Sequence, residues 1–407
     1  MEPPNDGALR GGRTGIGLCL SGGGFRATLF HLGALRRLNE TGILSRPDFR
    51  TVAAVSGGSI AAAGLATAYT RLPRRAAGPV PPEDWEREIV APLRSFTRRD
   101  VRTGPFLKRL VPWNLWRAET TVEALAARYE KELTSLRLVA LPERPDFLFL
   151  ATDMAYGVSW AFTREWMGDY QVGYMAPPSD FPVARAVAAS ACFPPLFDPM
   201  RLRLDPGALK GGSVSHGPQR DECLSDFRLT DGGDYDNMGL EPVWKNHAVV
   251  LVSDAGGLFN HESDRGLLWR VPRYQAIQER QARGLRKRWL IASFSAGTLD
   301  GTYWGVGGAP SHYHPASPGY SPDLARDVIG EIRTDLDAFS DAEAAVLENH
   351  GYLLTDAALR RHVTTVLPEP LPPAVVPHPD WFPPQRSEAA IRSALADSGK
   401  RRTWGRG

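Results

Sequence analysis

The sequence contains no long apolar run, and this absence limits what the chain can be. Nowhere do its 407 residues contain the roughly 18 consecutive apolar residues that a bilayer-spanning helix needs. Residues 1–13 are polar and lack the apolar core of a secretory signal peptide, so we expect none. We therefore expect a cytoplasmic protein whose contact with membranes, if it has any, is peripheral.

Cysteine and net charge are also scarce. The three cysteines, Cys19, Cys192 and Cys223, are an odd number and do not indicate a disulfide framework, which favours a reducing compartment. The formal net charge is only +2, so overall electrostatics do not favour a nucleic-acid partner. The composition is that of a globular protein, and the length suffices for one or two domains.

Glycine, by contrast, is concentrated at two turns near the start of the chain. The first turn, residues 21–27 (SGGGFRA), follows an apolar run and precedes a helical pattern over 28–40. The second, residues 54–59 (AVSGGS), follows another apolar run and precedes a helical pattern over 60–69. In a βαβ unit, two such turns lie at the same edge of a parallel sheet. One turn can present backbone N–H groups that stabilise an oxyanion, and the other can present a serine hydroxyl as the nucleophile. Acyl transfer requires both.

The second turn has the features of a nucleophile elbow, the sharp strand-to-helix turn that presents a catalytic serine. The usual pattern is G-x-S-x-G, and here Ala54 replaces the first glycine while Ser56 and Gly58 keep their places. Gly57 offers a backbone N–H at the start of the helix, where the helix dipole favours negative charge. The alternative is that Ser56 is an ordinary helix N-cap, a role for which Ser59 is the better candidate.

The first turn also fits a dinucleotide-binding fingerprint. Gly22, Gly24 and Ala27 satisfy G-x-G-x-x-A between a strand and a helix. That fingerprint requires an acidic residue at the end of the second strand, and here the second strand ends in Val55 and Ser56. We therefore do not expect a bound nucleotide. A purely structural role, in which the glycines only let helix and strand approach, would not require three glycines in a row.

A nucleophilic serine needs a base, and three aspartates at predicted strand ends compete for this role. Asp231 follows residues 227–230 and precedes two glycines, Asp254 follows an apolar strand, and Asp153 follows a third. Such aspartates often only cap the next turn. We prefer Asp231, because Gly232 and Gly233 leave its carboxylate sterically open. As a base near neutral pH it would need a pKa raised by burial.

A histidine could instead complete a Ser-His-Asp triad. Nine histidines are present, but none stands in a sequence context that distinguishes it from a loop or surface position. His312 and His314 have no cysteine or carboxylate nearby at ligand spacing. We therefore expect no metal and no cofactor, and keep the triad as the alternative mechanism.

Together these motifs resemble the patatin-like phospholipase family. The resemblance rests on SGGGFR at 21–26, the Ser56 elbow, the segment 189–197 (ASACFPPLF) and DGG at 231–233, in this order. The first of these is similar to the glycine turn of the group-IV cytosolic phospholipase branch. The resemblance implies an α/β fold, a three-layer α/β/α sandwich with a mostly parallel central sheet.

The resemblance also implies roles for individual residues. Ser56 is the expected nucleophile and Asp231 the base, in a dyad without histidine. Gly22, Gly23 and Gly24, together with the Gly57 N–H argued above, are expected to form the oxyanion hole. Arg26 matches the family's anion-stabilising arginine, and we predict that it binds substrate.

The function that we predict is a serine acyl hydrolase that cleaves fatty-acyl esters of lipids, with phospholipids as the expected substrates. A thioesterase or general carboxylesterase would use the same dyad. A catalytically idle lipid-binding module is the alternative from a different class, although the intact serine and aspartate argue against it.

Composition along the chain predicts its organisation. We expect a disordered arm over 1–13, a catalytic domain over 14–367, and a proline-rich linker with a short final helix over 368–407. Within the domain, 85–135 are expected to be helical, 265–289 a long basic helix, 290–294 a strand and 297–322 a loop. Residues 105–117 combine aromatic and basic side chains in a way that suits a lipid headgroup interface, although such aromatics more often pack in a core.

Overall fold

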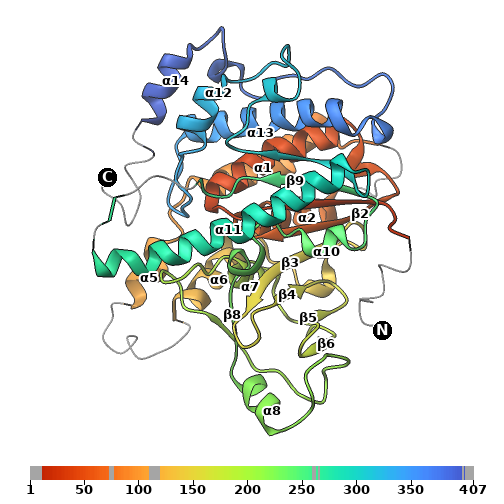
Figure 1. Ribbon diagram of the computed structural model, residues 1–407, viewed down its shortest axis with the longest axis vertical. Coiled ribbons are helices and arrows are strands. Elements are labelled where there is room, and N and C mark those ends of the chain that lie inside the picture. The colour runs from red at the N-terminus through yellow and green to blue at the C-terminus, as the bar shows by residue number, and fades with distance from the viewer. Residues whose placement is uncertain are drawn as a thin grey trace.

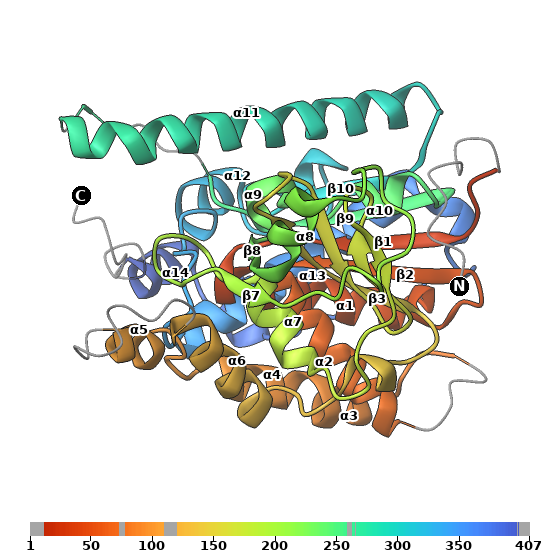
Figure 2. The ribbon, with the colours of Figure 1, turned by 90° about the horizontal axis from the view of Figure 1, so that it is seen from below.

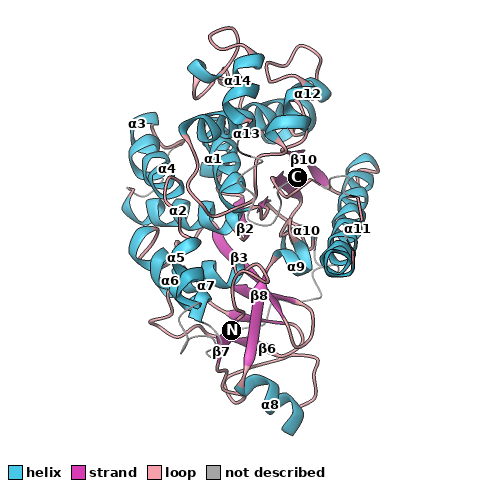
Figure 3. Cartoon of the chain, turned by 90° about the vertical axis from the view of Figure 1, so that its left-hand side faces the viewer, coloured by secondary structure: helices cyan, strands magenta, loops and turns pink. Residues whose placement is uncertain are grey.

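The chain folds around a central β-sheet that has helices on both faces, as the computed structural model shows (Figures 1 and 3). The structure describes residues 12–72, 78–109, 120–258, 263–264, 266–396 and 398. The three-layer α/β/α arrangement confirms the predicted fold class. Residues 1–11 of the predicted N-terminal arm lie outside the described residues.

Five strands form the parallel part of the sheet, in the order β10-β9-β1-β2-β3. They are β1 (Ile16–Leu20), β2 (Phe49–Val55), β3 (Asp146–Asp153), β9 (Val249–Asp254) and β10 (Asp300–Gly305). The strands β1, β2, β3 and β9 are almost entirely buried, as expected for parallel strands covered on both faces. β10 lies in the segment predicted to be a loop. That prediction was wrong: the glycines near both ends of β10 obscure the strand in the sequence pattern, and in the structure it pairs in parallel with β9.

Beyond β3 the sheet is antiparallel. The strands β4 (Ser159–Phe162), β5 (Met167–Asp169) and β6 (Gly173–Met175) continue the sheet away from β2. The strand β8 (Phe227–Asp231) runs antiparallel to both β3 and β7 (Met200–Leu202). The two glycine turns therefore belong to the parallel part of the sheet, whereas Asp231 is the last residue of the antiparallel strand β8.

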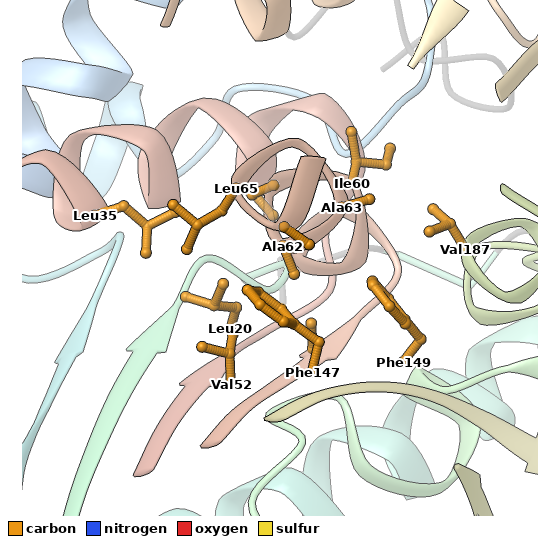
Figure 4. Close-up of a cluster of buried hydrophobic side chains, with 14 of the residues drawn as sticks. Leu20, Leu35, Val52, Ile60, Ala62, Ala63, Leu65, Phe147, Phe149 and Val187 are labelled. Carbon is orange, nitrogen blue, oxygen red and sulfur yellow. The ribbon is translucent and has the colours of Figure 1, made fainter. Parts of the chain in front are cut away.

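One face of the sheet is covered by α1 (Gly24–Glu40), α2 (Gly57–Arg71) and α13 (Asp341–His362), with α4 (Ala91–Thr97), α6 (Thr120–Glu132) and α7 (Val183–Ser190) beside them. Figure 4 shows this packing: Val52 and Phe147 of the strands lie against Ala62 and Leu65 of α2. The glycine- and alanine-rich sequence of α2 lets the helix lie close to the sheet.

The opposite face is covered by α10 (Glu241–Trp244) and α11 (Leu267–Ser295), which pack on a second apolar cluster. The predicted basic helix and the predicted strand that follows it are one helix, so the strand prediction was wrong. A short apolar run such as 290–294 cannot be assigned to a strand or a helix from its pattern alone. In the described part of the chain, no helix combines the length and apolar character needed to cross a bilayer.

The remaining helices are short and connect or flank these layers. They are α3 (Pro82–Trp85), α5 (Thr103–Arg109), α8 (Pro218–Ser225), α9 (Gly233–Asp236), α12 (Pro322–Leu324) and α14 (Glu388–Leu395). The segment predicted to be a linker packs on the body: Arg37 of α1 donates to the Pro372 carbonyl, and Ile391 and Leu395 of α14 are buried. The predicted short final helix is α14.

Candidate active site

Ser56 lies at the turn between β2 and α2, where the backbone is strained. Its φ of 51° makes it the one non-glycine residue with positive φ in the described part of the chain. Its side chain makes no capping hydrogen bond to α2, so the N-cap alternative is not favoured. Ser59 is not a cap either, because it lies inside the first turn of α2. Such local strain is typical of a nucleophile elbow.

The two glycine turns touch each other at Ser56. A Cβ atom on Gly57 would lie 2.0 Å from the Gly24 carbonyl oxygen, and one on Gly22 would lie 3.1 Å from the Ser56 Cβ. Only glycine allows backbones to approach this closely. The small residues at both turns therefore bring the first turn against the serine.

Asp231 reaches Ser56 because β2 and β8 occupy the same edge of β3. The strand β4 pairs with β3 over Phe149 to Thr152, which leaves the other edge of β3 for both β2 and β8. On that edge Leu150 pairs with Val55, and the next residue, Ala151, pairs with Asp231. The ends of β2 and β8 thus meet, and Ser56, which follows Val55, meets Asp231.

The Asp231 carboxylate is buried and hydrogen-bonded. Its Oδ1 accepts the Gly233 N–H at 2.7 Å. Burial raises the pKa of Asp231 to about 8, and the negative charge of Asp234 acts in the same direction, whereas the Gly233 N–H and the nearby Ser56 hydroxyl oppose it. A carboxyl with such a pKa is suited to accept a proton near neutral pH.

The four predicted oxyanion-hole residues surround Ser56 but are not equivalent. The Gly22 N–H donates to the Asn237 carbonyl at 2.9 Å, so this amide is used within the protein. Gly23 and Gly24 have positive φ and line the cavity beside Ser56. Gly57 is the first residue of α2, whose first N–H groups have no acceptor within the helix. The geometry favours Gly23, Gly24 and Gly57 as donors over Gly22.

Arg26 lies behind the glycine turn, away from the cavity. Its side chain is buried and donates to the carbonyls of Ala255, Gly330 and Ile332 at 2.7 to 3.2 Å. The Ala255 carbonyl also lies next to Gly23, because a Cβ atom there would be 2.6 Å from its oxygen. This placement does not favour the predicted substrate contact; Arg26 instead holds the segments behind the turn.

Ser190 is a residue of the site that we did not predict from the sequence. Its hydroxyl accepts the Ser56 N–H at 2.8 Å, donates to the Leu150 carbonyl at 2.6 Å and contacts the Ser59 hydroxyl. Its carbonyl accepts the Gly232 N–H. Ser190 thus connects the turn that carries Ser56 with the turn that follows Asp231. The sequence held one indication of its importance, because Ser190 lies in the segment 189–197 that resembles the family.

The other two candidate bases are engaged elsewhere. The Nη2 group of Arg283 on α11 donates to both carboxylate oxygens of Asp254 at 2.8 Å, and Asp254 also accepts a hydrogen bond from the Tyr303 hydroxyl. Burial alone would raise the pKa of Asp254, but Arg283 holds it well below its usual range. Asp153 is buried, and its pKa is raised to about 6, but it does not line the cavity of Ser56.

Histidines do not complete a triad in the described part of the chain. His31 is buried between Ser253 and the Ser21 carbonyl, and burial lowers its pKa to about 4. His312 and His362 line the cavity, but no described histidine hydrogen-bonds Ser56 or Asp231. His261 lies outside the described residues. The described residues contain no cluster of three or more potential metal ligands.

Ser56 and Asp231 open into a cavity of about 1290 Å³. Its wall combines apolar side chains with charged ones of both signs. The acidic residues are Asp231, Asp254, Glu279, Asp300 and Asp335. The apolar residues include Phe193, Leu196, Phe197, Leu258, Ile291, Phe294, Leu299, Val306 and Leu336, and the basic residues include Arg280, Arg283, Lys287 and Arg326. The inner face of α11 supplies much of one side. The cavity therefore suits an elongated apolar group with a polar end.

The predicted lipid-facing segment 105–117 is described only in part. Residues 105–109 belong to α5, and Leu107 is exposed. Trp113, Trp116 and the basic Arg117 lie outside the described residues. The interfacial role of this segment stays a prediction.

Comparison with known proteins identifies related sequences and structures. The family model of patatin-like phospholipase matches residues 18–244, which is more than half of the chain. No curated protein matches the chain. Human GIVD cytosolic phospholipase A2 is similar in structure with a TM-score of 0.41 and 13% identity, over 97% of this chain and 62% of that one. VipD from Legionella pneumophila gives a TM-score of 0.36 and 14% identity, over 86% and 67%. The chain thus spans less than two thirds of the human structure.

Proposed function

The chain belongs to the patatin-like phospholipase family, and from this premise we propose that it is a serine acyl hydrolase of lipid esters that uses Ser56 and Asp231. The observation that carries the proposal is the placement of the strained Ser56 turn beside the buried Asp231 carboxylate, with both residues at the wall of one cavity. A lipid substrate brings the enzyme into peripheral contact with a membrane.

In the proposed reaction, the Ser56 Oγ attacks the ester carbonyl carbon while Asp231 accepts the hydroxyl proton. The N–H groups of Gly23, Gly24 and Gly57 stabilise the negative oxygen of the tetrahedral intermediate. The C–O bond to the alcohol breaks, and Asp231 returns the proton to the leaving alcohol oxygen. Water, deprotonated by Asp231, then attacks the carbonyl carbon of the acyl-serine. The bond to the Ser56 Oγ breaks, Asp231 returns the proton to this oxygen, and the fatty acid is released.

The cavity supports a fatty-acyl ester as the substrate. Phe193, Leu196 and Phe197 provide an apolar wall for an acyl chain, and Arg280 and Lys287 of α11 provide positive charge on the same cavity. Positive charge suits the phosphate of a phospholipid. We therefore propose phospholipids as substrates, with release of a fatty acid and a lysophospholipid.

Two other functions use the same cavity. A thioesterase or general carboxylesterase would have the same dyad and would differ only in the leaving group. An idle lipid-binding module would bind lipid without turnover, which the Ser56–Asp231 contact does not favour. A panel of phospholipids, acyl thioesters and short soluble esters distinguishes the three.

The decisive experiment is covalent labelling with a fluorophosphonate probe, with hydrolysis measured in parallel. The parent protein is expected to become labelled at Ser56 and to release fatty acid, whereas Ser56→Ala should do neither. Ser59→Ala is the matched control and should still be labelled, because Ser59 is buried in α2 and does not line the cavity. Labelling of Ser56→Ala, or full activity in that variant, would refute the proposal.

A further inference from the structure

Half of the large apolar side chains that the described residues expose lie on one helix, α11. Seven of the fourteen belong to this 29-residue helix. Single exposed apolar residues are normal on a protein surface, but a cluster marks an interaction site. The helix lies along the outside of the molecule, apart from the other helices (Figures 2 and 3).

The most exposed of these side chains share one face of α11. Leu267, Val271, Tyr274 and Leu285 are 60 to 74% exposed and are spaced four, three and eleven residues apart. At about 100° per residue, these spacings keep all four within roughly 60° of one another. We call these four residues the outer apolar face of α11.

The opposite face of α11 belongs to the active-site cavity. Arg283, Lys287 and Phe294 of this face line the cavity that contains Ser56. Arg283 also attaches the helix to the sheet through Asp254 and the Gly257 carbonyl. The same helix therefore forms a wall of the cavity on one side and an apolar surface on the other.

The helix is also strongly positive. It carries seven arginine or lysine residues and a single acidic residue, Glu279. The formal charge of its own residues is therefore +6, seven positive less one negative. Arg270 pairs with Asp264, Arg283 pairs with Asp254, and Arg286 approaches Asp236 at 3.9 Å. Exposed apolar side chains on a basic helix are typical of helices that lie in the interface of an anionic lipid surface.

Exposed apolar side chains also occur among the residues that line the cavity. Phe193 and Leu258 line the cavity and are exposed at the same time. The cavity that contains Ser56 therefore also has apolar side chains at the protein surface.

From these observations we propose that α11 docks the protein on an anionic lipid surface through its outer apolar face. This inference rests on the proposed function for its biological purpose, because docking would place the cavity next to its substrate. The binding itself requires no catalysis and is tested without it.

The test measures sedimentation of the full chain, carrying Ser56→Ala, with vesicles of phosphatidylcholine alone or mixed with phosphatidylglycerol. Binding is expected on the anionic vesicles, and it should weaken when salt rises from about 0.05 to about 0.5 M. Combining Leu267→Gln, Val271→Gln and Tyr274→Gln should lower the partition coefficient about tenfold or more.

A matched pair of single variants controls for surface hydrophobicity. Val271 and Val375 are both 66% exposed, and the Val375 N–H binds Tyr352 of α13, far from α11 in sequence. Val271→Gln should weaken vesicle binding several-fold, whereas Val375→Gln should not. The proposal would be overturned if Val271→Gln and Val375→Gln weakened vesicle binding equally, or if the triple variant bound vesicles like the parent. Equal binding of the parent to neutral and anionic vesicles would also overturn it. The proposal would also be overturned if the triple variant lost only self-association, measured by light scattering, and still bound vesicles.

Hydrolysis of a soluble short-chain ester separates this proposal from the proposed function. With Ser56 intact, the triple variant should hydrolyse the soluble ester at the parent rate and anionic vesicles about tenfold more slowly. If no ester is cleaved while vesicle binding follows the predicted pattern, the proposed function fails and the docking surface stands.

Discussion

Among single residues, Asp231 controls the proposed chemistry through its ionisation. Only the ionised carboxylate can accept the Ser56 proton, and burial raises its pKa to about 8. At pH 6 most of the enzyme therefore holds a protonated, inactive Asp231. We expect kcat/KM for a soluble ester to rise about tenfold per pH unit below this value and to level off above it. A profile that is flat from pH 5 to 9 would contradict this assignment.

Asp231→Asn tests the same carboxylate and controls for folding. Turnover should fall by about 10³ or more, because the amide cannot accept the proton. Since the pKa of Asp231 is higher in the folded chain than in the unfolded chain, its contribution to stability is lost as pH rises from about 4 to about 8. The variant should therefore gain melting temperature relative to the parent over this range. An inactive variant that is also unstable at pH 8 would point to a structural role.

Ser190 is predicted to position the nucleophile without touching the substrate. Ser190→Ala removes the acceptor of the partly buried Ser56 N–H, which costs about 1 kcal/mol in unfolding free energy. Displacement of the elbow should lower kcat about ten- to a hundredfold and leave KM nearly unchanged. Ser59→Ala is the control, because the Ser59 hydroxyl contacts Ser190 but not the Ser56 N–H. Equal losses in both variants would mean that packing, not positioning, is responsible.

Among the elements, the contact between the starts of α1 and α2 creates the site. A methyl group on Gly57 would collide with the Gly24 carbonyl and push the two turns apart. Gly57→Ala should therefore lower kcat at least about 10²-fold, the size of effect expected when an oxyanion donor is misplaced. The measurement is ester hydrolysis together with a melting curve.

Gly257→Ala is the matched control for this element. Gly257 lines the same cavity, and a Cβ atom there would meet no atom within 4 Å. This variant should keep most of its activity. If both glycine variants behave alike, close contact of the turns is not what the activity requires.

Across the whole molecule, we expect the C-terminal segment to stabilise the rest of the chain, because it packs on it. Arg37 of α1 has a buried side chain that donates to the Pro372 carbonyl and pairs with Asp356, and Tyr320 donates to the Trp381 carbonyl. Deleting residues 368–407 also removes the buried Ile391 and Leu395. We expect a loss of about 5 kcal/mol in unfolding free energy, measured by denaturant titration. An unchanged midpoint would support the sequence-based prediction that residues 368–407 include a linker.

The tertiary structure changed what could be said of several residues. The arginine in SGGGFR matches a family pattern, but its three carbonyl partners are contributed by segments more than 200 residues away. Ser190 is 134 residues from the amide that it accepts. The meeting of β2 and β8 on one edge of β3 likewise depends on pairing between distant strands.

The sequence by itself determined the local features: two glycine turns between strands and helices, a serine in an elbow, aspartates at strand ends, and through these the family and the α/β fold. These features depend on the conformations of a few consecutive residues, so short patterns encode them. The structure decided which aspartate meets Ser56, that the Gly22 amide and Arg26 are used within the protein, and that α11 borders the cavity. Buried groups find their partners through long-range packing, which no local pattern records.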